Sequence, residues 1–132
     1  MQFYRILVLL LLIFFIFSQD LEDLSFGDEN SLDIATWNIE WFPKNGQTTV
    51  QYVAAIIEQL ELDVLAIQEL DDRSMFDQMV LELNDYIGYY ESSWFAGLAY
   101  IYRSDTVEIN DIYEIYTTSQ YWNAFPRSPM VM

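Results

Sequence analysis

Two strings, SLDIATWN at residues 31–38 and DVLAIQE at residues 63–69, decide the fold together with the helical pattern that separates them. The first alternates residue by residue and predicts a strand that ends near Asn38, and the second is a short apolar run typical of a buried strand. Between them, apolar residues recur at helical spacing: Val50, Val53, Ala54, Ile57 and Leu60. Strand, helix and strand in this order predict a βαβ unit with parallel strands. Asn38 and Glu69 then emerge at the same edge of one sheet.

The remaining pattern continues this alternation of helices and strands. Proline and an Asn-Gly pair place a loop at residues 42–46, and Thr48 or Thr49 is expected to cap the helix that follows it. A second helix is predicted from about Asp72 to Asn84. Strands are predicted at residues 86–90, 97–102 and 106–116, with a turn at Ser104-Asp105 between the last two.

The first residues are typical of a secretory leader. Arg5 precedes an unbroken apolar run at residues 6–17, which is short for a membrane span and ends at the small residue Ser18. We therefore predict a signal peptide at residues 1–18, an acidic spacer at 19–30 and one domain at 31–132. The predicted location is exported, either secreted or periplasmic, with no stable membrane association after cleavage. An uncleaved membrane anchor is the alternative.

Strong acidity restricts the class of partner. The chain has 5 basic and 21 acidic residues, a net charge of −16, and cleavage of the leader would remove Arg5 as well. Nucleic-acid affinity normally depends on Lys and Arg that displace counterions, so loose binding to phosphate backbones is opposed. Phosphate chemistry in such a chain needs a metal ion to reverse the local field. The alternative interpretation is that the negative charge only keeps the chain soluble. The absence of cysteine excludes disulfides and a lipid-modified cysteine anchor.

Asn38 and Glu69 indicate a functional site only when they are considered together. An asparagine at a strand end ordinarily serves in a turn, and a lone glutamate after a strand is ordinarily a solvated carboxylate. An amide oxygen and a carboxylate at one sheet edge form half of the ligand shell of a hard divalent cation.

Four strings resemble the endonuclease/exonuclease/phosphatase superfamily, which has the fold of deoxyribonuclease I. They are IATWNIEW (34–41), DVLAIQE (63–69), AGLAYIYR (96–103) and FPRSP (125–129), and they occur in the family's order. The fold class implied is α/β (α+β), a partial four-layer α/β/β/α sandwich truncated before its second half. The implied activity is metal-dependent phosphodiester hydrolysis, with an exported nuclease first and a phosphatase or sphingomyelinase-like phosphodiesterase as the alternative.

The resemblance also implies site residues. Asn38 and Glu69 would form the metal site, with Glu69 bound directly to Mg²⁺ and with Mn²⁺ as the other candidate ion. Arg127 would approach the substrate phosphate, because a guanidinium fork matches phosphate oxygens; a surface ion pair is the alternative role. Glu40 is a further, weaker candidate at the same edge. The implied partner is a phosphodiester substrate, with nucleic acid the leading class, and the pattern predicts no oligomeric state.

One departure from the family limits the activity expected of this chain. Family members use histidines in the middle and near the end of the domain, and this sequence contains none. The simplest interpretation is that the chain corresponds to the amino-terminal half of such a domain and is poorly stable and inactive by itself. The rival interpretation is a non-catalytic surface or interaction protein that kept the fold.

Overall fold

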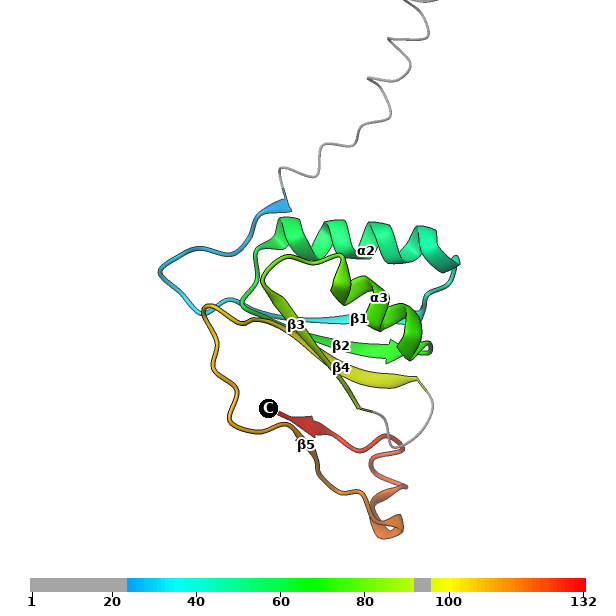
Figure 1. The fold of residues 1–132 in the computed structure, drawn as a ribbon. Helices are drawn as coiled ribbons and strands as arrows, with labels where there is room; N and C mark the ends of the chain where they lie inside the picture. The colour runs from blue at the N-terminus through cyan, green and yellow to red at the C-terminus, as the bar shows by residue number, and fades with distance from the viewer. Residues whose placement is uncertain (1–23, 92–95) are drawn as a thin grey trace, which may run out of the picture.

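The computed structural model describes residues 24–91 and 96–132 (Figure 1). The elements are β1 (Ile34–Phe42), α2 (Gly46–Leu60), β2 (Val64–Leu70), α3 (Arg73–Leu81), β3 (Tyr86–Glu91), β4 (Gly97–Arg103), β5 (Tyr113–Glu114), the 3-10 turn η2 (Ser119–Tyr121) and β6 (Met130–Val131). The predicted signal peptide and the first part of the predicted spacer lie outside the described residues. In the described part of the chain, no helix has the length and apolar character needed to span a membrane.

A four-stranded mixed sheet forms the centre of the fold, in the order β1-β2-β4-β3. The predicted βαβ unit is confirmed: β1 runs parallel to β2, with Asn38 opposite Gln68, while β4 pairs antiparallel with both β2 and β3. Figure 1 shows both helices on one side of the sheet and the C-terminal segment, coloured orange to red, on the other. The predicted fold class is confirmed as a mixed α+β arrangement consistent with a partial α/β sandwich.

The core lies between the sheet and the two helices. The predicted face of α2 packs there, with four side chains buried (Val50, Val53, Ala54 and Ile57) and Leu60 partly buried. Helix α3 buries Phe76 and Met79 against the same cluster. Its first turn begins at the N-cap Asp72, whose carboxylate accepts the Met75 N–H at 3.0 Å. The core is therefore built from the helical periodicity of two segments against one sheet face.

The end of β1 differs from the prediction. The strand does not stop near Asn38 but continues to Phe42, whose side chain is completely buried. Its carbonyl accepts the backbone N–H groups of Asp71 at 3.0 Å and Asp72 at 3.2 Å, which ties the end of β1 to the start of α3. The apolar contact of Phe42 with the core outweighs the local turn tendency of the residues that follow.

The predicted cap of α2 is also wrong. The helix begins at Gly46, so Thr48 and Thr49 lie inside it, and Asn45 is the N-cap residue without a side-chain cap bond. Thr49 instead accepts the Asn45 N–H with its hydroxyl at 3.0 Å. The hydroxyl thus satisfies a backbone donor just outside the helix, from the first turn rather than from the cap position.

The strand predicted at residues 106–116 is wrong for most of its length. A turn follows β4 at residues 104–106, as predicted at Ser104-Asp105, but only Tyr113–Glu114 forms a strand, β5, which pairs with β6. The physical reason is that β4 is already flanked by β2 and β3. The segment after β4 therefore finds no free edge beside it and crosses to the other side of the sheet.

Gly88 on β3 allows α3 to approach the sheet closely. A Cβ at this position would lie 2.5 Å from a Val80 methyl carbon and 3.0 Å from the Phe76 ring. Overpacking of this kind costs about 1–3 kcal/mol, more than the roughly 0.5–1 kcal/mol that alanine ordinarily gains over glycine. We expect Gly88→Ala to lower the free energy of unfolding measured in urea. Ile87→Ala, at the exposed neighbouring position, is the control, and an unchanged midpoint for Gly88→Ala would contradict the close approach.

Candidate metal and phosphate site at the sheet edge

Two irregularities in the strands lie at the edge where β1 and β2 end. Across β2 and β4, Gln68 faces Leu98 and Leu70 faces Gly97, so Glu69 is an extra residue in a β-bulge, with φ 65°. In β1 the register also shifts between Asn38 and Phe42, where Glu40 has φ 48° and Trp41 φ 58°. The left-handed region costs a non-glycine residue about 1–2 kcal/mol. β-Bulges change the direction of side chains and are common at functional sites, so this edge of the sheet is a candidate functional site.

Asn38 lies on the sheet face that points away from the helices, together with Thr36 and Gln68. Gln68 Nε2 donates to Thr36 Oγ1 at 2.8 Å, which fixes these side chains beside one another. Asn38 Oδ1 accepts the backbone N–H of Glu40 at 3.0 Å, which holds the amide at the edge. A carbonyl oxygen has a second lone pair, so this bond leaves Oδ1 able to bind a cation.

Glu69 meets Arg127 at the same edge. Arg127 Nη2 lies 3.7 Å from Glu69 Oε1, while Arg127 Nη1 donates to the carbonyl of Ala96 at 3.0 Å. The Glu69 side chain is 20% exposed and that of Arg127 is 37% exposed. The Ala96 carbonyl therefore fixes the guanidinium, and the longer contact to Glu69 is an electrostatic pairing of two partly exposed groups.

Both basic and acidic side chains lie near this edge. The described residues contain four basic side chains, and three of them (Lys44, Arg73 and Arg127) follow β1, follow β2 or contact the start of β4. Arg73 lies over the Tyr90 ring, 5.6 Å from its centroid. Lys44 is paired with Glu40 at 2.7 Å and Arg73 lies 3.9 Å from Asp77, so Arg127 is the basic side chain that we consider for a phosphate.

Not every predicted site residue joins the group. Asn38, Glu69 and Arg127 lie at one edge, but Glu40 turns to Lys44, with Oε1 2.7 Å from Nζ, and its side chain is 69% exposed. Ala96, which holds Arg127 through its carbonyl, is absent from the sequence-based candidates. A backbone carbonyl has no signature in the sequence, so only the position of Arg127 against the start of β4 could reveal it.

The donor atoms fit a hard divalent cation with few protein ligands. Glu69 offers a carboxylate and Asn38 an amide oxygen, which are the donor types that Mg²⁺ and Mn²⁺ accept while they retain water. Among residues 24–91 and 96–132, no group of three or more His, Cys, Asp or Glu side chains is placed to hold a metal. An ion at this edge would therefore keep most of its ligands as water or substrate oxygen atoms.

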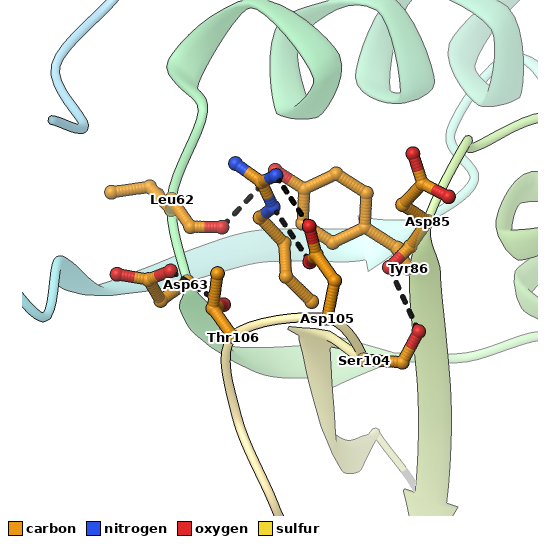
Figure 2. Close-up of polar contacts among 8 residues, drawn as sticks. Leu62, Asp63, Asp85, Tyr86, Ser104, Asp105 and Thr106 are labelled. Atoms are coloured by element: carbon orange, nitrogen blue, oxygen red, sulfur yellow. Dashed lines mark hydrogen bonds and ion pairs between the residues drawn. The ribbon is translucent and has the colours of Figure 1, made fainter. Parts of the chain in front are cut away.

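Polar residues at the opposite end of the sheet line a hollow of about 650 Å³. There the buried Asp63 carboxylate accepts the Asp33 backbone N–H at 2.8 Å and the Thr106 hydroxyl at 2.7 Å. Arg103 donates two hydrogen bonds to Asp105, which lower the pKa of that carboxyl below its usual value. Figure 2 shows Asp63, Asp105 and Thr106 at this end of the sheet. These polar groups form hydrogen bonds with one another between the ends of the strands, so we assign them a structural role.

The comparison with protein families identifies one relationship. The model of the Endonuclease/Exonuclease/phosphatase family matches residues 35–128, which include every residue of the edge described above. No curated protein and no solved structure matches the chain. The match covers most of the chain and includes β1 through the segment that carries Arg127.

Proposed function

Because this chain belongs to the endonuclease/exonuclease/phosphatase family, we propose that it provides the metal-binding and phosphate-binding edge of a phosphodiester-hydrolysing domain. The enzyme that we propose is an exported nuclease. The observation that carries this proposal is the convergence of Asn38, Glu69 and Arg127 at one end of the sheet. The three residues come from separate segments of the chain. Their oxygen donors and guanidinium suit a divalent cation and a phosphate respectively.

Each residue has a separate task in the proposal. Glu69 holds the divalent cation directly, and the bulge keeps its carboxylate at the edge. Asn38 offers its amide oxygen from the neighbouring strand β1, where it pairs with Gln68, the residue before Glu69. Arg127 binds phosphate oxygens, anchored by the Ala96 carbonyl. A bound divalent ion would polarise the phosphoryl oxygen and offset charge on the leaving group.

A base that activates water is missing from this scheme. The sequence contains no histidine, the side chain that most often acts as a general base near neutral pH. We expect this chain to bind a divalent ion and a phosphodiester without hydrolysing it. If the natural protein has no further segment, the lack of histidine favours the second candidate function, a non-catalytic surface or interaction protein that retained the fold.

Nucleic acid is the proposed substrate class, with phospholipid and inositol phosphate as the rivals within the family. Export, supported by the leader-like residues 6–17, agrees with digestion of extracellular nucleic acid. The family relationship by itself does not select among these substrates, because one fold serves many of them.

Binding and turnover measured together test the proposal. Fluorescence anisotropy of a labelled DNA oligonucleotide is recorded with Mg²⁺ and with EDTA, beside cleavage on a gel. RNA, choline phospholipid vesicles and inositol phosphates are compared in parallel. We expect Mg²⁺-dependent binding of the oligonucleotide without cleavage. Cleavage would refute the inactive state, tighter binding of a rival substrate would refute the nuclease assignment, and the absence of metal-dependent binding would refute the site.

A further inference from the structure

An exposed group of aromatic rings lies in the turn that precedes Arg127. Tyr116 stacks on Phe125 with centroids 4.9 Å apart and an interplanar angle of 8°, and Tyr121 packs against Tyr116 at 4.8 Å. We refer to Tyr116, Tyr121 and Phe125 as the aromatic turn. Tyr116 is 43% exposed and Phe125 37% exposed, so a large part of this pair faces solvent. The proposed function assigns no task to these rings.

Backbone hydrogen bonds hold the aromatic turn in its form. The N–H groups of Ala124 and Phe125 donate to the Tyr121 carbonyl at 2.9 Å and 2.8 Å, and this closes the chain after η2. Tyr116 has φ 58°, a left-handed conformation that a tyrosine rarely adopts. These hydrogen bonds fix Tyr121 and Phe125 relative to each other, and the Tyr116 ring contacts both of their rings.

The aromatic turn continues directly into the proposed phosphate site. Phe125 is two residues before Arg127, so their Cα atoms are at most about 7 Å apart. Figure 1 shows the turn below the end of the sheet at which the arrow of β2 points, on the side away from the helices. A ligand whose phosphate contacts Arg127 can therefore extend a flat group toward the rings.

Charge supports an anionic ligand in this segment. Residues 115–132 contain no Asp or Glu and include Arg127, whereas the whole chain has 21 acidic residues. This segment therefore adds positive but no negative charge to the surface that a phosphate at Arg127 would meet. Aromatic rings beside a phosphate-binding arginine are the combination by which proteins bind single-stranded nucleic acid, since each base has a π-face that can stack.

We propose that the aromatic turn is a stacking platform for a nucleobase of a single-stranded or unpaired substrate whose phosphate contacts Arg127. This inference rests on the proposed function and deepens it, because it selects nucleic acid over inositol phosphates and phospholipids. Stacking adds to the phosphate contact and does not depend on base identity, so the platform accepts different sequences.

A pair of oligonucleotides isolates the stacking contribution. Binding of the full chain to a short oligo-dT is compared, by anisotropy with Mg²⁺, with an abasic deoxyribose-phosphate strand of equal length and charge. We expect oligo-dT to bind at least about fivefold more tightly, the lower bound for one stacked base. Phe125→Leu, which keeps apolar volume and removes the ring, should abolish this preference and leave abasic-strand affinity unchanged.

Controls separate the outcomes. Tyr52→Leu removes a ring that is 63% exposed on α2 and should leave the preference intact. If the wild-type chain binds oligo-dT and the abasic strand with equal affinity, the stacking platform is refuted and the phosphate site is not. Binding of neither strand would overturn both. Choline phospholipid vesicles that lose binding on Phe125→Leu, without any base preference, would identify a lipid-contacting surface instead and overturn the platform.

Discussion

Glu69→Gln is expected to lower the affinity of the chain for Mn²⁺ by more than tenfold. Glu69 is the carboxylate at the proposed site, and a neutral amide of the same shape removes the charge that attracts the ion. Substitution of groups that only support a metal ligand already costs about 10- to 100-fold in affinity, and a direct ligand is expected to cost at least as much. Titration of free Mn²⁺ by electron paramagnetic resonance measures the loss without any need for turnover.

An acidic surface binds Mn²⁺ weakly at many places, so the control must remove the same charge elsewhere. Glu108→Gln changes an exposed carboxylate beyond the turn that follows β4, at the other end of the sheet, and should leave the tightest site unchanged. Equal effects of the two substitutions would show that the ion is attracted by net charge alone. Arg127→Gln removes the cation 3.7 Å from Glu69 and should strengthen Mn²⁺ binding while weakening phosphate binding.

Glu69→Gly distinguishes loss of the ligand from loss of the fold. The residue has φ 65°, a conformation that glycine adopts without strain. We expect this variant to lose Mn²⁺ binding as Glu69→Gln does and yet to unfold at a higher urea concentration. Such opposite changes are expected where a strained residue is kept for function.

Phe42→Ala is expected to produce the largest loss of stability, about 3–5 kcal/mol, as for other buried phenylalanines. The side chain is 0% exposed and belongs to the core cluster, at the point where β1, β2 and α3 meet. Small domains have about 5–15 kcal/mol of total stability, so the variant would be close to unfolding. Urea denaturation followed by tryptophan fluorescence measures the change.

Two comparisons make the Phe42 result specific. Phe26→Ala removes the same atoms from a side chain that is 69% exposed and should change stability by less than about 0.5 kcal/mol. Phe42→Leu keeps most of the apolar volume and should cost clearly less than Phe42→Ala. Similar losses for Phe26→Ala and Phe42→Ala would mean that Phe42 is not a core residue.

Local sequence was sufficient to predict the features that depend on the repeat of apolar residues and on the direction of the chain. The spacing of Val50, Val53, Ala54 and Ile57 predicted the buried face of α2, because a helix repeats its faces every 3.6 residues. Parallel pairing of β1 with β2 followed from a helix of suitable length between two apolar runs. The position of Asn38 beside the end of β2 follows from that pairing alone.

Prediction failed where a residue's state depends on distant partners. The pattern predicts that the first strand ends near Asn38, before the loop at residues 42–46, yet β1 continues to the buried Phe42. Residues 106–116 have strand-like composition, but a strand needs a free edge and β4 offers none. The sequence indicates no role for the Asp63 side chain, and only the fold shows its carboxylate buried between Asp33 and Thr106.

Sequence patterns were enough to predict the βαβ unit, the apolar face of α2 and the edge at which Asn38 and Glu69 emerge. These features depend on repeat and direction within short segments. Only the folded structure reveals that Glu69 lies in a bulge, that the Ala96 carbonyl holds Arg127, and that Tyr116 stacks on Phe125. Each of these depends on contacts between segments far apart in the chain, for which no local pattern of residues carries information.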